Sequence, residues 1–493
     1  MGKSTRREFL KAAGLGAASL ALTGSMPLSA QDGGTRPRPN ILLCIADDWS
    51  WPHASIAGDP VVRTPAFDRV AREGVLFENA FVTAPSCTPS RSSILTGQWH
   101  WRLEEGGNLW STLPARFAVY PDLLEKAGYH VGVTRKGWGP GRIEPGGRTR
   151  NPAGQSYKDF RAFLEACPHG APFCFWFGST DPHRPYKQGS GVKSGMKPQD
   201  VRVPACLPDN EIVRSDLCDY YGEVQRFDRE VSELLGLLEA SGDMDNTLVV
   251  VTGDNGLPFP RCKSNLYDLG THVPLAIRWP ARVPGGRIVK DFVSLQDLAP
   301  TFIEAANLTP PSEMTGHSLI AILTSGRSEH GQSGRDHVLT GKERHAWVRK
   351  GGLGYPCRAI RTHDFLYIRN YEPGRWPAGD PVDGGAPYYP NWSYGDIDGS
   401  PTKTYMLEHA DKTHVRKLFE LACAKRPAEE LYDLRRDPEQ LNNVVGVPDY
   451  AAARKELAAA LQAELAATGD PRALDAGDVF DRYPYYGGQQ PRR

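Results

Sequence analysis

Two pairs of acidic or amide residues follow strand-like apolar runs, and their side chains could hold a metal ion. Asp47 and Asp48 end the run NILLCIADD, and Asp254 and Asn255 follow the run TLVVVTG. Oxygen donors without neighbouring His or Cys suit a hard divalent ion, Ca²⁺ or Mg²⁺, better than zinc. Each pair taken alone is better explained as a cap or a turn. Two pairs at strand ends together favour a metal site.

Cys87 opens a second group of residues that could do chemistry, in the stretch CTPSRSSILTG. Pro89 and the small polar residues predict a helix N-terminus, where free backbone N–H groups attract an anion, and Arg91 adds a charged donor. A thiol at this position is expected to have a lowered pKa, which favours a cysteine nucleophile. Thiolate phosphatases, however, carry arginine six residues after the cysteine, and Ser93 stands there. A plain cysteine nucleophile therefore lacks its anion-binding partner.

The elements that must position these residues alternate between strands and helices. Apolar runs predict strands at 40–48, 130–134, 172–179, 247–254 and 273–280, and helical patterns lie at 64–74, 120–127, 156–166 and 216–241. A continuous apolar run is typical of a strand buried on both faces. Alternating strands and helices predict an α/β sheet with helices on both faces. The ligand site of such a sheet lies at the carboxyl ends of its strands.

The pattern changes near Arg335. The stretch RAIRTHDFLYIRNYEP alternates like a half-exposed hairpin, and a helix is expected at 451–467. We therefore expect three parts: an export signal over 1–30, a catalytic α/β domain over 31–334, and a smaller α+β domain over 335–493.

The first residues are typical of a bacterial twin-arginine export signal. STRREFLK carries paired arginines, AAGLGAASLALTG is a short apolar run, and small residues suit cleavage after Ala30. The run is too short and glycine-rich to cross a bilayer. We expect a periplasmic or secreted protein that uses the twin-arginine export machinery, without stable membrane insertion. In such a compartment Cys206 and Cys218 could form a disulfide, a question that the sequence leaves open.

The charge composition gives no indication of a polyanionic partner. Lys plus Arg and Asp plus Glu number 58 each. No global field favours nucleic acid, so any anion must be bound by local charge.

Over its whole length, CTPSRSSILTG resembles the signature of the formylglycine-dependent (type I) sulfatases. The resemblance implies that a maturation enzyme oxidises Cys87 to formylglycine, whose hydrated aldehyde attacks sulfur. It also implies one calcium ion, preferred over Mg²⁺, held by Asp47, Asp48, Asp254 and Asn255 together with residue 87. The implied fold is an alkaline-phosphatase-like α/β/α sandwich with a smaller C-terminal α+β domain that contains a four-stranded antiparallel sheet.

The resemblance extends to further catalytic residues. Lys136 in TRKGWGPG matches the lysine that holds sulfate, but Trp138 stands where the family commonly has histidine. His183 in DPHRPY matches a histidine that contacts sulfate and can protonate the leaving group. Lys263 occupies the position of a sulfate-binding base. The stretches around His183 and Lys263, with AEELYDLRRDPEQLNNV, resemble the heparan N-sulfatase (sulfamidase) branch, which has arginine in place of Lys263.

The resemblance therefore implies hydrolysis of sulfate from a sulfated carbohydrate, with an N-sulfoglucosamine-type sulfamate as lead substrate and carbohydrate O-sulfates as the other option. Two alternatives stay open: a phosphate or phosphonate ester hydrolase of the same superfamily, and a non-catalytic sugar-binding relative. Aromatic and cationic residues that could line the sugar site, or equally belong to ordinary packed loops, are His100, Arg102, Trp138, Arg184 and His363.

Overall fold

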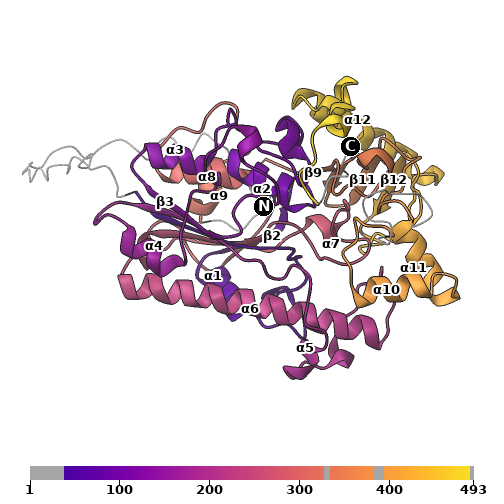
Figure 1. Ribbon diagram of the computed structural model, residues 1–493, viewed down its shortest axis with the longest axis horizontal. Helices are drawn as coiled ribbons and strands as arrows, with labels where there is room; N and C mark the ends of the chain where they lie inside the picture. Colours follow the sequence, from indigo (N-terminus) through magenta and orange to yellow (C-terminus); the bar gives the residue numbers. More distant parts are fainter. Residues whose placement is uncertain (1–37, 327–333, 382–392, 489–493) are drawn as a thin grey trace, which may run out of the picture. The chain divides into compact units, whose positions relative to one another are not determined.

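The computed structural model describes residues 38–326, 334–381 and 393–488 (Figure 1). The predicted export signal over 1–30 lies outside these residues. Among the helices that the structure describes, none is long and apolar enough to cross a membrane. All nine cysteines are free thiols, Cys206 and Cys218 included.

An eight-stranded sheet forms the centre of the larger part of the molecule, in the order β4-β3-β5-β1-β6-β7-β2-β8. Its strands are parallel except β7, which runs antiparallel to both neighbours. The strand bounds are β1 Asn40–Ala46, β2 Val75–Phe81, β3 His130–Arg135, β4 Gln155–Ser156, β5 Phe173–Gly178, β6 Thr247–Gly253, β7 Leu275–Arg278 and β8 Arg287–Ser294. The apolar runs predicted as strands are confirmed, whereas β2, β4 and β8 were not predicted.

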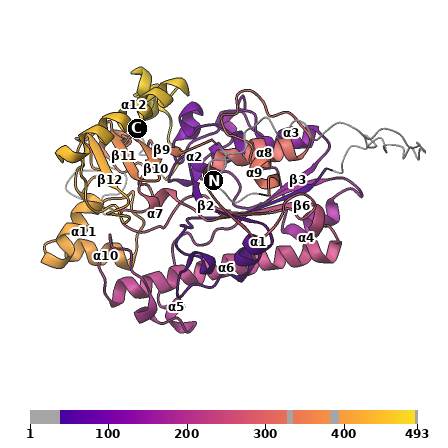
Figure 2. The ribbon, with the colours of Figure 1, turned by 180° about the vertical axis from the view of Figure 1, so that it is seen from behind.

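Helices cover both faces of this sheet (Figures 1 and 2). One face carries α1 Pro65–Glu73, α4 Phe160–Ala166 and α6 Glu211–Ser241, and the other carries α2 Cys87–Thr96, α3 Tyr120–Lys126, α8 Leu298–Ala305 and α9 Ile320–Thr324. Strand β1 shows why: Leu42 and Cys44 pack in the first layer, while Ile41 and Leu43 pack in the second. The predicted α/β class is confirmed.

A second, four-stranded antiparallel sheet has the order β12-β11-β10-β9. Its strands are β9 His337–Lys342, β10 Cys357–Thr362, β11 Phe365–Asn370 and β12 Glu429–Asp433, and the predicted C-terminal helix is α12 Ala451–Ala467. Leucines of α12 at i, i+4 and i+8, Leu457, Leu461 and Leu465, cover one face of this sheet. The remaining helices are α5 Ser190–Lys193, α7 Asp268–Thr271, α10 Pro401–Glu408, α11 Thr413–Cys423 and α13 Val479–Arg482.

The other face of the small sheet packs against the loop that follows β6. Ala359 and Ile368 of the sheet share one apolar cluster with Leu266 and Tyr267 of that loop. The loop also contains Lys263, so the C-terminal part of the chain helps to fix a residue of the predicted site. The boundary predicted near Arg335 falls between α9 and β9 and stays a prediction.

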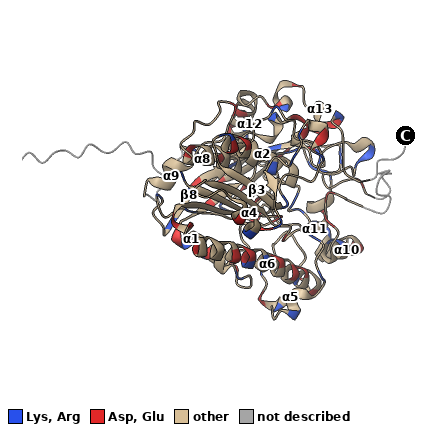
Figure 3. Cartoon of the chain, turned by 60° about the vertical axis from the view of Figure 1, so that its left-hand side comes forward, with Lys and Arg blue, Asp and Glu red and all other residues tan. Residues whose placement is uncertain are grey.

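Charged residues of both signs are interspersed along α6 and the neighbouring elements (Figure 3). This distribution agrees with the balanced composition of 58 basic and 58 acidic residues.

Candidate active site

The predicted carboxylate pairs meet at the carboxyl ends of two neighbouring strands. Ala46 of β1 pairs with Gly253 of β6, so the residues that follow each strand are neighbours. The Asp48 backbone turns through a left-handed conformation, with φ of 75°, and its N–H donates to Asp254 Oδ1 at 3.0 Å. Ligand atoms of Asp47, Asp48, Cys87 and Asp254 all lie within 4.8 Å of one another. The sheet topology thus brings together residues that are far apart in the sequence.

Cys87 is the first residue of α2 and points into this group. Its Sγ lies 3.4 Å from Asp47 Oδ1 and 3.8 Å from Asn255 Nδ2. Burial, followed by the negative charge of Asp47, raises the pKa of the thiol well above its usual value. The lowered pKa expected from the helix N-terminus is therefore wrong, because burial and the carboxylates outweigh the helix dipole.

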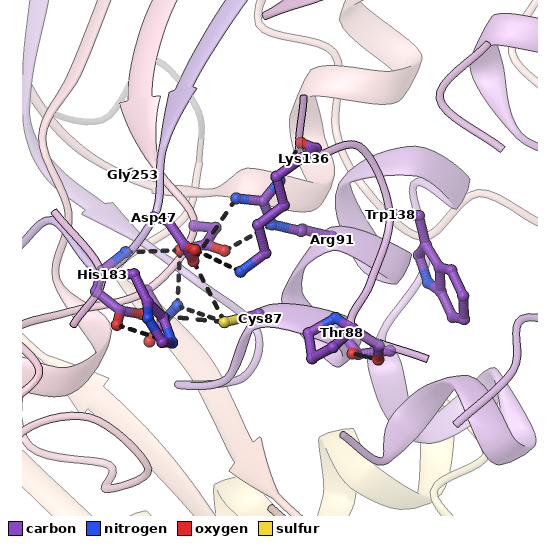
Figure 4. Close-up of polar contacts among 12 residues, drawn as sticks. Asp47, Cys87, Thr88, Arg91, Lys136, Trp138, His183 and Gly253 are labelled. Atoms are coloured by element: carbon purple, nitrogen blue, oxygen red, sulfur yellow. Dashed lines mark hydrogen bonds and ion pairs between the residues drawn. The ribbon is translucent and has the colours of Figure 1, made fainter. Parts of the chain in front are cut away.

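Two lysines approach the carboxylates from different loops. Lys136 follows β3 and its Nζ lies 2.5 Å from Asp47 Oδ2; Lys263 donates to Asp48 Oδ2 at 2.7 Å. Burial alone would raise the pKa of Asp47, but the charges of Lys136 and then His183 hold it below its usual range. Figure 4 shows the Lys136 side chain directed toward Asp47. The ammonium groups concentrate positive charge beside the thiol.

Arg91 is completely buried and connects the strand-end carboxylates to the loop that carries Lys136. Its Nε donates to Asp254 Oδ2 at 2.6 Å, while Nη1 donates to the carbonyl oxygens of Lys136 and Gly137 at 2.8 Å each. The single guanidinium neutralises a buried carboxylate and fixes the main chain at Lys136.

His183 follows β5, and its ring is oriented by the main chain. Nδ1 donates to the carbonyl oxygen of Arg184 at 2.5 Å, and Nε2 lies 3.9 Å from Asp48 Oδ2. The Nε2 atom is therefore the one directed at the cluster.

Several side chains of the site line a cavity of about 750 Å³. Its lining includes seven of the residues singled out from the sequence: Asp47, Cys87, Lys136, Trp138, His183, Arg184 and Lys263. Trp138 is buried, donates from its indole nitrogen to Ser92 Oγ at 2.9 Å, and lies apart from the polar cluster in Figure 4. Arg184 makes a bidentate pair with Asp216, at 2.8 and 2.9 Å, so its guanidinium is already engaged.

Three residues expected at the sugar site are not among those that line this cavity: His100, Arg102 and His363. His100 is fully buried, with its ring beside Trp101. Arg102 donates to the carbonyl oxygen of Thr468 at 3.3 Å. The His363 ring lies 4.5 Å from that of Phe292. All three contribute to packing between the two parts of the molecule.

The sequence analysis missed several cavity residues, among them His345, Asp398, Asp181 and Arg226. His345 Nδ1 lies 2.8 Å from Oγ of Ser86, the residue before Cys87. Burial lowers the pKa of His345 to about 3, so its imidazole is neutral. His345 and Asp398 belong to no local motif and come from the C-terminal part of the chain. Asp181 stands within DPHRPY, which could have pointed to it.

The donor set fits a hard divalent cation. Asn255 Oδ1 is buried and lacks a hydrogen-bond partner among the residues described. Burial, together with the neighbouring carboxylates of Asp47 and Asp254, raises the pKa of Asp48 to about 6, and a cation among these carboxylates would stabilise its charged form. Carboxylate and amide oxygens are the ligands that Ca²⁺ and Mg²⁺ prefer.

A mostly parallel sheet with carboxylates, a buried cysteine and lysines at its strand ends defines a hydrolase of the alkaline-phosphatase-like fold that acts on an anionic group. The sulfatase family model matches residues 39–140 and 148–308, and the model described as N-sulphoglucosamine sulphohydrolase, C-terminal, matches residues 262–375. The chain belongs to the sulfatase family, and it is an enzyme of the sulfatase class.

Known sulfatases are similar to the chain over most of its length. It is 29% identical to the human N-sulphoglucosamine sulphohydrolase, covering 84% of this chain and 87% of that protein. It is 25% identical to an ulvan-active sulfatase of Formosa agariphila, covering 90% of this chain and 78% of that protein.

Solved structures share the fold. One is a protein in complex with its substrate D-glucosamine-2-N,6-O-disulfate, with a TM-score of 0.60, 20% identity, and coverage of 88% of this chain and 98% of that one. Another is the phosphonate monoester hydrolase of Agrobacterium radiobacter, with a TM-score of 0.65, 20% identity, and coverage of 87% and 96%.

Proposed function

We propose that this chain hydrolyses sulfate from a sulfated saccharide, with an N-sulfoglucosamine-type sulfamate as the lead substrate and a carbohydrate O-sulfate as the second option. The observation that carries the proposal is the meeting of Cys87, Lys136 and Lys263 around the strand-end carboxylates. Two ammonium groups thus reach the carboxylates that lie beside the side chain that the signature marks as the nucleophile precursor. Such a site favours an anionic sulfuryl group.

The proposal includes oxidation of Cys87 to formylglycine by a maturation enzyme. In its hydrated form this group supplies one hydroxyl that can attack sulfur and a second hydroxyl through which sulfate can be released. In the folded chain Cys87 is only 2% exposed. Limited access supports maturation before folding is complete, and therefore before twin-arginine export of a folded protein to the periplasm or beyond.

We assign one calcium ion to Asp47, Asp48, Asp254 and Asn255, next to residue 87. Bound calcium would supply positive charge for the sulfuryl oxygens and for the attacking hydroxyl. It would also neutralise carboxylates that now pair with Lys136 and Lys263. The two ammonium groups would then be available to bind the nonbridging oxygens of the substrate.

His183 is assigned the proton transfer to the leaving atom. The bond from Nδ1 to the carbonyl of Arg184 fixes the ring. Nε2 is then the atom that can deliver a proton to the departing oxygen or nitrogen.

A phosphate or phosphonate ester hydrolase is the second candidate, because the same charges could bind a phosphoryl group and the phosphonate monoester hydrolase shares the fold with a TM-score of 0.65. The sulfuryl reading has the additional support of the complete CTPSRSSILTG signature.

The proposed function is tested on protein co-produced with a formylglycine-forming enzyme. Mass spectrometry of the tryptic peptide ending at Arg91 reports the state of residue 87, and release of sulfate or phosphate is measured over a panel of sulfamates, sulfate esters and phosphonate esters. We expect an aldehyde at residue 87 and turnover of sulfated sugars. An unmodified thiol in fully active protein, or turnover confined to phosphonates, would refute the proposal.

A further inference from the structure

Asp398 is a carboxylate that the C-terminal part of the chain brings into the cavity. Its Oδ2 accepts a hydrogen bond from Lys263 Nζ at 3.2 Å. Ligand atoms of Asp48, His183 and Asp398 lie within 4.8 Å of one another. His183 is the residue assigned to the leaving atom, so Asp398 borders the leaving-group side of the site as well as Asp48, one of the proposed metal ligands.

The loop that carries Asp398 is held by a buried network. Two residues earlier, Asp396 accepts hydrogen bonds from Arg349 Nη2 at 2.6 Å, Lys342 Nζ at 3.2 Å and the Ala346 N–H at 3.1 Å. Lys403 Nζ donates to the carbonyl oxygen of Ile397 at 2.8 Å. A side chain held in this way is preorganised, so little ordering is needed when a ligand binds.

Only one oxygen of the Asp398 carboxylate is engaged in a hydrogen bond within the described residues. Lys263 takes Oδ2, and Oδ1 has no hydrogen-bond partner among the described residues. An ionised carboxylate can only accept hydrogen bonds. Asp398 thus offers a charged acceptor beside the atom that leaves.

The two substrate options differ at that atom. A sulfamate has a bridging nitrogen that carries an N–H donor, whereas a sulfate ester has a bridging oxygen with lone pairs only. A fixed carboxylate favours the first and repels the second, and a site built for an N–H discriminates strongly against an analogue that lacks it.

We propose that Asp398 is a specificity-determining residue that accepts a hydrogen bond from the bridging N–H of a sulfamate and so favours N-sulfated over O-sulfated sugars. This inference rests on the proposed function and names the substrate class of the same site.

The Asp398→Asn variant gives a directional test. The Lys263 ammonium requires an oxygen, so it would hold the amide Oδ1 and turn Nδ2 toward the substrate. The amide would then present a donor, which conflicts with a sulfamate N–H and matches an ester oxygen. The expected result is a change in preference rather than a general loss of activity.

The matched substrates are glucosamine N-sulfate and glucose 2-O-sulfate, which differ in the bridging atom at carbon 2. Loss of a charged hydrogen bond lowers kcat/KM roughly ten- to a hundredfold. We expect Asp398→Asn to reduce the ratio of kcat/KM for the sulfamate over the ester by that factor, and Asp398→Ala to reduce it less. Asp380→Asn is the control, because Asp380 lies outside the cavity and accepts from the Lys350 N–H at 2.8 Å.

Binding provides a second readout. In a Cys87→Ala background, which should not turn over, calorimetric Kd values for the two sugars should show the same change of ratio when Asp398→Asn is added. Thermal unfolding checks that each variant is folded. If both sugars lose affinity and turnover equally, Asp398 serves only to hold Lys263, and the inference is overturned while the sulfatase function stands. Wild-type protein that hydrolyses no sulfated sugar would instead overturn the proposed function.

Discussion

Removing the Arg91 guanidinium should destabilise the protein and the Lys136 loop together. In Arg91→Ala the Asp254 carboxylate, which is completely buried, loses its 2.6 Å partner. Breaking a buried ion pair costs about 3–5 kcal/mol. At about 2.1 cal/mol/K per residue, the unfolding entropy of a unit spanning Arg38–Arg493 is about 1 kcal/mol/K. The expected fall in the apparent Tm is therefore about 3–5 °C.

The effect on turnover follows from the other two hydrogen bonds of Arg91. Without them, the carbonyl oxygens of Lys136 and Gly137 lose the donor that holds them at 2.8 Å. A displacement of about 1 Å in a catalytic group can cost about a hundredfold in rate, so we expect kcat/KM to fall by about that factor. Arg91→Lys retains the charge but not the geometry, and it should recover about half of the lost Tm.

Scanning fluorimetry and sulfate release from glucosamine N-sulfate measure the two effects. Arg358→Ala is the matched control, because Arg358 is equally buried and bonds to Asp470 at 2.6 Å in the second sheet. It should lose similar stability, with a much smaller effect on turnover well below the unfolding temperature. The reasoning fails if Arg91→Ala keeps wild-type turnover, or if Arg358→Ala loses as much turnover as Arg91→Ala does.

Three further outcomes are expected. Cys87→Ala should abolish sulfate release while the apparent Tm stays within about 2 °C of wild type, since a small buried side chain is shortened; residual turnover would contradict the role of residue 87. Removing calcium with a chelator should abolish activity. It should also lower the apparent Tm by about 3 °C compared with protein in calcium at a hundred times the Kd, because ligand binding at that concentration stabilises the folded state by about 2.7 kcal/mol. Identical melting curves with and without calcium would count against the metal site. His272 has its pKa lowered to about 4 by burial, so the unfolded chain binds the proton first, and stability should fall by up to about 3 kcal/mol between pH 6.5 and 4. Acid unfolding of His272→Gln should show a smaller loss over that range, and an unchanged profile would argue against this contribution.

The parts of the site that could be predicted from the sequence are those fixed by local rules. A buried parallel strand must be apolar throughout, and its first polar residues must fall at its carboxyl end. That rule was sufficient to find Asp47 and Asp254 and to expect them near each other. The helix that starts at Cys87 was likewise indicated by Pro89 and the small polar residues, and α2 begins at that residue.

Predictions based on residue type alone were less informative. Aromatic and basic side chains suit a sugar site, but they suit a packed interface equally well. His100 and Arg102 lie where the second sheet and α12 pack against the sequence that follows α2. The pKa of Cys87 also depends on burial and on carboxylates that the fold places beside it. The position at a helix N-terminus therefore predicted a lowered pKa, whereas the pKa is raised.

The cavity therefore has two sides of different origin. Strand ends of the large sheet supply the groups proposed to bind the metal and the sulfuryl oxygens, and these lie in recognisable motifs. The other side comes from segments that follow β9 and β11, where His345 and Asp398 depend on how the C-terminal part packs against the Lys263 loop. A motif can identify the reaction because the charge of a sulfuryl group imposes similar requirements on every enzyme that binds it. The sugar imposes no such common requirement, so its selection depends on the contacts that local sequence rules do not reveal.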